Sequence, residues 1–145
     1  MNKHQKISLF LVRLSLGWMY FYAGITKVLD PEWSAGGYLK TAKSFTGFYG
    51  WLTQPNILPT VDFINQWGMT LLGASLILGL FVKLSSPLGA LMMFLYYLPT
   101  LNFPLAGTHS YIIDEHIIYI FILIFLGVSG AGKIWGLDSR LKLNK

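Results

Sequence analysis

Ionisable and amide side chains capable of chemistry are few in this largely apolar chain. The candidates are Arg13, Lys27, Asp62, Asn65, Gln66, Asn102, Asp114 and His116. A carboxylate or imidazole beside a cation can hold and move protons, and ammonium and amide groups donate hydrogen bonds to carbonyl oxygens. This combination suits a quinone, whose carbonyls need donors, whose reduction consumes protons and whose isoprenoid tail prefers lipid. We therefore expect Asp114 and His116 to handle protons and the other six residues to bind substrate.

Most of these side chains also have a structural interpretation. Asp62 and Asp114 are expected in the first turns of helices, where a carboxylate caps free amides and complements the helix dipole. Glu115 has the same explanation, and His109 is expected in a loop. A metal site built from His109, Asp114 and His116 matches no compact ligand spacing, so we expect no bound metal.

The composition indicates a membrane protein. Of the 145 residues, 54% are hydrophobic and 12% are charged, whereas soluble domains carry roughly 25% charged residues. The length predicts a single domain covering residues 1–145. The net charge of +5 does not indicate a nucleic-acid partner, because the cations gather at the expected membrane boundaries. With no cysteine, redox chemistry needs a bound organic cofactor or a partner chain.

Four apolar segments are long enough to predict membrane spans. Their approximate ranges are 7–29, 60–82, 87–103 and 114–132. The first would be about 34 Å long at 1.5 Å per residue, enough to cross a hydrocarbon layer of roughly 30 Å. The sequence therefore predicts an all-α integral membrane protein, a four-helix transmembrane bundle.

Both cations of the first segment fall on one face of the predicted helix. Arg13, Gly17, Tyr20, Gly24 and Lys27 recur at helical spacing. Glycines let helix backbones approach each other, and charges must avoid lipid. We predict that this stripe faces inward. The alternative is that the two cations extend to opposite interfaces of the membrane.

The connections and the ends of the spans carry three further predictions. Residues 34–53 are expected to form an amphipathic helix at the membrane interface, with a soluble loop helix as the alternative. Ser86 is expected to cap the third span, with Pro87 in its first turn. Pro99 cannot donate a hydrogen bond to the carbonyl of Leu95, so that carbonyl needs another partner.

The distribution of cations predicts the topology. Most of them lie near the amino terminus, at Lys83 and in the tail with Lys133, Arg140, Lys142 and Lys145, so both termini are expected in the cytoplasm. The outer ends of the four spans then lie together. We expect their polar side chains to share one chamber. Small interhelical residues also allow a homo-oligomer.

Three sequence blocks carry a resemblance to a known family. They are RLSLGWMYFYAGITKVLDPEWSAGGYL, VDFINQWGMTLLGASLILGLFVKLSSPLGALMMFLYYLP and HSYIIDEHIIYIFILIFLGVSGAGKIWGLD. In this order they resemble the DoxX/DoxD family of four-helix membrane proteins, which includes the DoxD subunit of thiosulfate:quinone oxidoreductase. The resemblance implies a prokaryotic cytoplasmic membrane protein. It also implies a second subunit, DoxA, which nothing in this chain resembles.

The resemblance and the polar residues together predict a function. We expect a quinone-linked oxidoreductase subunit that oxidises thiosulfate to tetrathionate and passes electrons to membrane quinone. Lys27, helped by Lys40 or Lys43, would attract the dianion. The alternative is a non-enzymatic scaffold or electron-delivery subunit for a partner oxidoreductase. A carrier of small solutes or lipids is a third possibility, although the chain shows no internal repeat.

Overall fold

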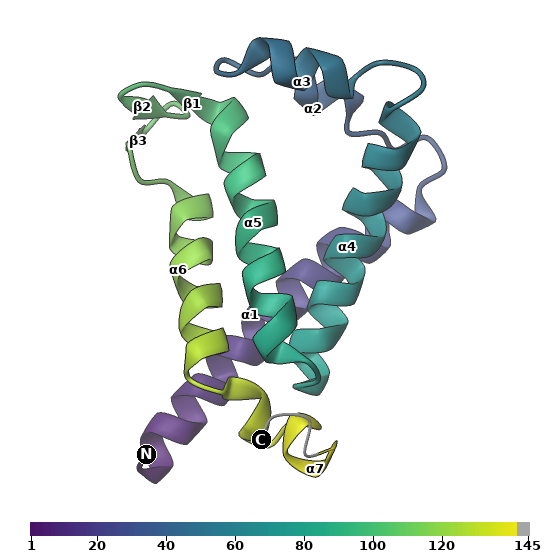
Figure 1. Ribbon diagram of the computed structural model, residues 1–145. Coiled ribbons are helices and arrows are strands. Elements are labelled where there is room, and N and C mark those ends of the chain that lie inside the picture. The colour runs from purple at the N-terminus through teal and green to yellow at the C-terminus, as the bar shows by residue number, and fades with distance from the viewer. Residues whose placement is uncertain (142–145) are drawn as a thin grey trace.

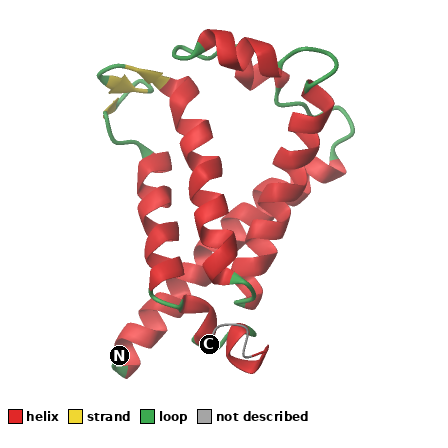
Figure 2. Cartoon of the chain, viewed as in Figure 1, coloured by secondary structure: helices red, strands yellow, loops and turns green. Residues whose placement is uncertain are grey.

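Helices make up most of the structure, a computed structural model that describes residues 1–141 (Figures 1 and 2). The elements are, in order, α1 (Lys3–Leu29), α2 (Gly36–Leu39), α3 (Thr46–Leu52), α4 (Leu58–Leu78), α5 (Val82–Thr100), β1 (Leu101–Asn102), β2 (Leu105–Ala106), β3 (Ser110–Tyr111), α6 (Glu115–Val128), the 3₁₀ turn η1 (Ala131–Lys133) and α7 (Asp138–Leu141). The strands form a small antiparallel sheet in the order β1-β2-β3.

The four long helices form two arms that diverge from a common base. Figure 1 shows α4 and α5 meeting at their connecting turn and separating toward α2 and α3. Helix α1 packs along α4, and α6 packs along α5. The middle of α1 also reaches α6, where the rings of Tyr20 and Tyr119 lie 6.4 Å apart. The four long helices are therefore present, but α4 and α5 diverge at one end.

Direct backbone contact joins α1 to α4. A Cβ atom added at Gly24 would lie 2.3 Å from the amide nitrogen of Thr70, and one added at Gly73 would lie 2.2 Å from that of Phe21. Larger side chains at either glycine would force the helices apart. Arg13, Gly17, Tyr20 and Gly24 are all buried. The predicted inward stripe on the first helix is confirmed.

The turn between α4 and α5 is held by Asp138, the first residue of α7. Gly79 and Phe81 have positive φ angles of 63° and 55°. The carboxylate of Asp138 accepts hydrogen bonds from the amides of Phe81, at 2.7 Å, and Val82, at 3.2 Å. These are free amides at the amino end of α5, so Asp138 caps that helix from a distant part of the sequence.

Several predicted boundaries are wrong, since α4 ends at Leu78 instead of residue 82 and α6 ends at Val128 instead of residue 132. Helix α5 begins at Val82, earlier than predicted, so Pro87 lies inside the helix and Ser86 is a buried interior residue rather than a cap. Helix α5 ends at Thr100, within the predicted span of residues 87–103, and Leu101 and Asn102 form β1 of the small sheet, which was not predicted. The single helix predicted for residues 34–53 is two short helices, α2 and α3, separated by the non-helical residues 40–45, the last of which, Phe45, is left-handed with φ 51°.

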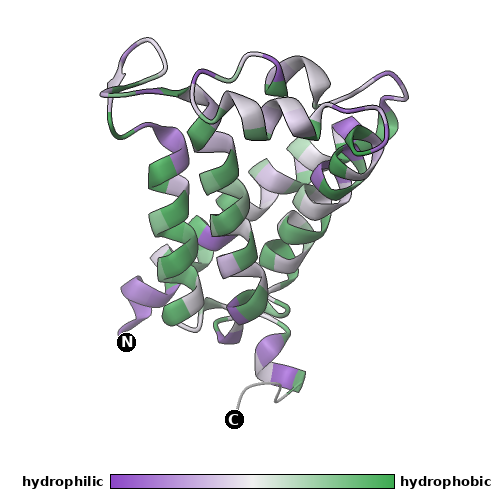
Figure 3. Ribbon diagram, turned by 45° about the horizontal axis from the view of Figure 1, so that its top comes forward, coloured by the Kyte–Doolittle hydropathy of each residue, from purple (hydrophilic) through white to green (hydrophobic). Residues whose placement is uncertain are grey.

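The long helices consist mostly of hydrophobic residues (Figure 3), and much of their outer surface is apolar. Its exposed side chains include Trp18, Leu71, Leu88, Phe121 and Val128. Extended exposed apolar surface of this kind marks contact with a membrane or a partner. Among the described residues, α1 is long and apolar enough to cross a membrane, and α6 is apolar but shorter. The prediction of four crossing helices stays a prediction.

Both ends of the described chain lie at the base of the arms. Figure 1 shows the amino terminus and α7 at the end of the molecule opposite to α2, α3 and the sheet. Lys133 and Arg140 lie in η1 and α7 at this end. Lys142 and Lys145, which contributed to the predicted orientation, lie outside the described residues. The cytoplasmic location of the termini stays a prediction.

Candidate functional site: an apolar cleft with a lysine at one end

A cleft of about 1080 Å³ lies between the diverging arms. Its walls come from α4 and α5, and α2 and α3 cover one end. We call residues 36–52, which include both short helices, the lid. The α4 wall contains Asn65, Gly68, Leu72 and Ser75, which share one helical face. Apart from a few polar groups near the two ends, the lining is aliphatic and aromatic. The cleft can therefore accept a long apolar group.

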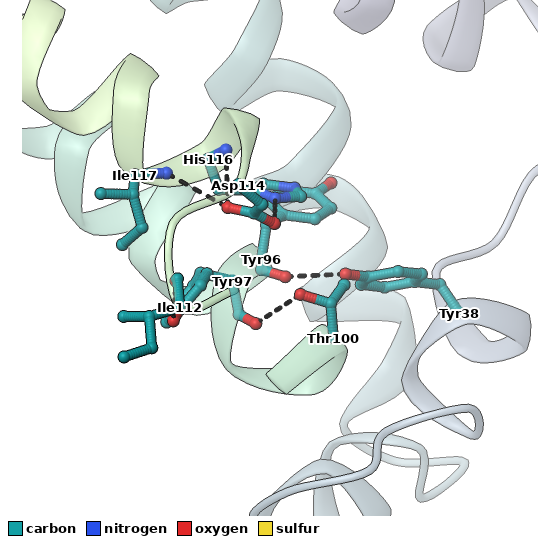
Figure 4. A network of polar contacts seen from close by, with 8 residues as sticks. All are labelled: Tyr38, Tyr96, Tyr97, Thr100, Ile112, Asp114, His116 and Ile117. Carbon is teal, nitrogen blue, oxygen red and sulfur yellow. Dashed lines mark hydrogen bonds and ion pairs between the residues drawn. The ribbon is translucent and has the colours of Figure 1, made fainter. Parts of the chain in front are cut away.

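Hydrogen bonds fasten the lid to the end of α5. The hydroxyl of Tyr49 donates to the carbonyl oxygen of Leu95 at 2.8 Å, and that of Tyr38 donates to the carbonyl oxygen of Tyr96 at 2.7 Å (Figure 4). The amide of Lys43 donates to the carbonyl oxygen of Pro99 at 2.9 Å. The prediction that Pro99 leaves the carbonyl of Leu95 in need of a partner is confirmed, and the lid supplies that partner.

Lys27 lies at the lid end of the cleft and contacts three acceptors. Its Nζ lies 3.0 Å from Asn65 Oδ1, 3.2 Å from the hydroxyl oxygen of Tyr96 and 3.1 Å from Met69 Sδ. Asn65 Nδ2 also donates to the Tyr96 hydroxyl. The ring of Trp33 lies 4.9 Å from Nζ, within the range of a cation–π interaction. We call Lys27, Asn65, Met69 and Tyr96 the Lys27 cluster.

No carboxylate of residues 1–141 forms an ion pair with Lys27. The side chain is half-buried, and its acceptors are an amide, a phenol and a thioether, all neutral. A thioether sulfur is a weak acceptor. The cluster therefore offers a ligand a positive charge. It also offers one N–H of Lys27, whose present acceptor, the sulfur of Met69, can be replaced by a stronger acceptor.

Asp114 and His116 form a separate pair behind Tyr96. Asp114 Oδ2 lies 2.7 Å from His116 Nδ1, and Oδ1 accepts hydrogen bonds from the amides of His116, at 3.0 Å, and Ile117, at 3.3 Å. Asp114 is thus the N-cap of α6. The imidazole stacks on the Tyr96 ring, with centroids 6.2 Å apart and planes 12° apart (Figure 4). Neither residue lines the cleft.

The remaining outer residues are not gathered around Lys27. Asp62 lies in the second turn of α4, not the first, and accepts a hydrogen bond from the amide of Ala35 at 2.8 Å. Gln66 Nε2 donates to the carbonyl oxygen of Lys27 at 3.3 Å. Asn102 is exposed on β1. The structure therefore brings together Lys27 and Asn65 of the predicted substrate-binding set, with Gln66 beside them.

Arg13 lies far from the Lys27 cluster. It precedes Lys27 by four turns of α1, which places the two about 21 Å apart along the helix axis. Its side chain is fully buried, and Nη1 donates to the carbonyl oxygens of Ala131, at 2.6 Å, and Ile134, at 3.2 Å. Arg13 thus holds the η1 segment against α1 and does not line the cleft.

Sequence reasoning missed several residues of the site. Trp33, Tyr38 and Met69 were not predicted to approach Lys27 or the cleft, since each belongs to a different element and no local spacing relates them. For Tyr49 a signal existed, because the free carbonyl of Leu95 demanded a donor. Within the described residues, no group of three or more histidine, aspartate or glutamate side chains is placed to hold a metal ion.

Comparison with known proteins gives one match. Curated proteins show no match to the chain, and neither do solved structures. The family model named DoxX matches residues 8–101, which is the region from α1 through the end of α5. It contains the Lys27 cluster, the lid and both walls of the cleft. The chain belongs to the DoxX family.

Proposed function

We propose that the chain is the quinone-binding membrane subunit of a DoxX-type oxidoreductase that oxidises thiosulfate to tetrathionate. The observation that carries the proposal is the placement of a lysine ammonium at one end of a long apolar cleft. A membrane quinone has the matching shape, with polar carbonyls on a ring and an apolar tail. Ligand sites of this kind combine apolar walls with a few placed polar groups.

The residues of the cleft fit such a ligand. Lys27 Nζ and the hydroxyl of Tyr96 can donate to a carbonyl oxygen, and Trp33 and Tyr38 present aromatic faces beside them. From Tyr96 to Ser85 the cleft follows α5 for about 16 Å, which is half of a hydrocarbon layer of roughly 30 Å. An apolar tail can lie along this wall and leave between α4 and α5.

Thiosulfate would supply the electrons from the aqueous side. Coupling of two thiosulfate anions into tetrathionate releases two electrons, and a quinone that receives them takes up two protons. Lys40 and Lys43 are exposed on the lid, where they attract anions. The chain has no cysteine to carry a thiosulfonate, so the anions would couple on a partner resembling DoxA.

For Asp114 and His116 the geometry favours a positioning role in this proposal. The imidazole stacks on Tyr96, and Asp114 fixes both the imidazole and the start of α6. Together they hold the Tyr96 ring from the side opposite to the cleft. Proton transfer from this pair to a bound ligand would have to pass Tyr96.

The separation of this pair from the cleft favours a second candidate function. None of the described residues that line the cleft is a histidine, aspartate or glutamate, so the lining binds well but offers no strong proton donor besides Lys27. A subunit that holds quinone for a partner oxidoreductase needs no more than this. The non-enzymatic electron-delivery subunit is therefore the alternative.

Quinone content and quinone reduction test the proposal together. The full chain, purified in mild detergent, is extracted with organic solvent and analysed for quinone by mass spectrometry. Quinone reduction by thiosulfate is then measured with and without a DoxA-like subunit. We expect bound quinone in the wild type and in Lys83→Met, whose lysine is exposed at the base of α5, and much less in Lys27→Met.

The results separate the two candidates. Bound quinone with thiosulfate-dependent reduction supports the oxidoreductase. Bound quinone without reduction in either preparation supports the electron-delivery subunit. Absence of quinone from the wild type, together with background rates, overturns both.

A further inference from the structure

Lys27 carries a charge that the described residues do not neutralise. Its acceptors are neutral, and no carboxylate of residues 1–141 is paired with it. A cation removed from water is stabilised most by a negatively charged partner that also accepts a hydrogen bond. Such charge-assisted hydrogen bonds are roughly twice as strong as neutral ones. The cluster is therefore better matched to an anionic oxygen than to a neutral carbonyl.

The space beside Lys27 is suited to a small head group. Trp33, Tyr38 and Tyr96 line the cleft next to the ammonium, and the hydrogen bonds of Tyr38 and Tyr49 hold the lid over them. A carboxylate oxygen can replace the sulfur of Met69 as the third acceptor of Nζ. A head group as large as a phospholipid's would have to displace the lid.

The rest of the cleft is suited to one alkyl chain. Leu71 on α4 and Leu84, Leu88 and Leu91 on α5 line it, and each is more than half exposed. These side chains leave a large apolar surface uncovered along about 16 Å of helix, the depth of one membrane leaflet. Covering apolar surface is favourable by roughly 25 cal/mol per Å².

We propose that the cleft binds a long-chain carboxylate, with its ionised head at Lys27 and its alkyl chain along α5 toward Ser85. This ligand differs from the quinone of the proposed function and requires no redox chemistry. Because both would occupy the same cleft, the carboxylate competes with quinone. The chain would then respond to free fatty acids in the membrane as well as to quinone.

A matched pair of ligands tests the inference on the wild-type chain. Laurate and dodecanol have alkyl chains of the same length and differ in charge. Binding of each to the full chain in nonionic detergent is measured by titration calorimetry at neutral pH. A hydrogen bond to a charged group contributes about 1.5–3 kcal/mol, so we expect laurate to bind at least about tenfold more tightly than dodecanol. Equal affinities would overturn the inference without any variant.

Three variants locate the site. Lys27→Gln should remove the preference for laurate, because it deletes the charge and keeps a hydrogen-bond donor, whereas Lys83→Gln should keep the preference. Gly68→Leu should weaken both ligands, because Gly68 lines the cleft and an added Cβ meets nothing closer than Met92 Cε at 3.5 Å. Laurate preference that survives Lys27→Gln would refute the assignment of the head group.

The same titrations distinguish this inference from the proposed function. Quinone content is measured by solvent extraction, independently of laurate. Bound quinone with equal laurate and dodecanol affinities would overturn the carboxylate inference alone. Laurate preference with no bound quinone and no reduction would overturn the proposed function alone.

Discussion

The hydroxyl of Tyr49 donates a hydrogen bond of 2.8 Å to the carbonyl oxygen of Leu95. Leu95 lies four residues before Pro99, whose nitrogen has no proton to donate. A side chain of the lid thus replaces the helical hydrogen bond that proline removes. The proline that interrupts the hydrogen bonding of α5 therefore also provides the attachment point of the lid over the cleft.

Removing this hydroxyl should loosen the lid. Tyr49→Phe leaves the partly buried carbonyl of Leu95 without its partner, and the loss of a partner by a buried acceptor costs up to about 1–3 kcal/mol. We expect a lower melting temperature and faster proteolysis within residues 36–52. Tyr111→Phe is the control, because Tyr111 is exposed and none of its side-chain contacts holds the lid. Equal melting temperatures and cleavage rates for the two variants would contradict the role assigned to Tyr49.

The lid should also respond to high pH. Burial raises the pKa of both Tyr38 and Tyr49 to about 12, from about 10 in an unfolded chain. Below about pH 10 the two phenols are protonated in the folded and in the unfolded lid, so the lid has its full stability. As pH rises from about 10 to about 12, the phenols ionise in the unfolded lid before they ionise in the folded lid. The unfolded lid is thereby favoured, and lid stability falls. Tryptophan emission followed against pH should show lid opening in this range.

The control for the pH experiment is the double variant Tyr38→Phe and Tyr49→Phe. It has no phenol within the lid to ionise, so its emission should not change between about pH 10 and 12 beyond the response of the remaining tyrosines. An identical transition in the double variant would show that other groups cause it.

Two substitutions of Asp114 distinguish its role as the N-cap of α6 from the role of its negative charge. Asparagine is as good an N-cap as aspartate, whereas alanine costs typically about 1 kcal/mol. We expect Asp114→Asn to keep the free energy of unfolding within about 0.5 kcal/mol of wild type, and Asp114→Ala to lower it by about 1 kcal/mol. Chemical denaturation followed by circular dichroism measures both.

Quinone reduction by the same two variants tests the proton-handling prediction. If Asp114 and His116 only hold the Tyr96 ring in place, Asp114→Asn should retain most of the turnover. Loss of turnover in Asp114→Asn at unchanged stability would instead favour the proton-handling role predicted from the sequence.

Arg13 should affect stability and not ligand affinity. Arg13→Gln removes a charged donor from the carbonyl oxygens of Ala131 and Ile134, and bonds of this kind contribute about 1.5–3 kcal/mol. We expect a fall of about 2 kcal/mol in the free energy of unfolding. Laurate and quinone affinities should stay unchanged because Arg13 lies about 21 Å from Lys27 along α1. A selective loss of affinity would restore Arg13 to the binding site.

Local sequence rules predicted the features that depend on neighbouring residues. The spacing of Gly17 and Gly24 placed one face of α1 inward, and Pro99 identified a carbonyl in need of a donor. The N-cap role of Asp114 followed from its position before an apolar run. These predictions succeeded because helix periodicity and backbone hydrogen bonding act over a few residues.

Features that depend on distant contacts could not be predicted in the same way. The stack of His116 on Tyr96 turns the imidazole away from the cleft, and it depends on how α6 packs against α5. Residues 40–45 interrupt the predicted interfacial helix, and within this interruption the amide of Lys43 donates to Pro99 of α5, a contact that no local spacing reveals. Capping of α5 by Asp138 made Ser86 unnecessary as a cap, so the helix could begin earlier.

The distance in sequence between Asp138 and α5 has a consequence for biosynthesis. A ribosome completes α5, the small sheet and α6 before it reaches Asp138. Until then the amides of Phe81 and Val82 lack their carboxylate, and the angle between α4 and α5 is not yet fixed by it. The turn that joins the two walls of the cleft therefore receives its capping carboxylate only after all four long helices have been synthesised.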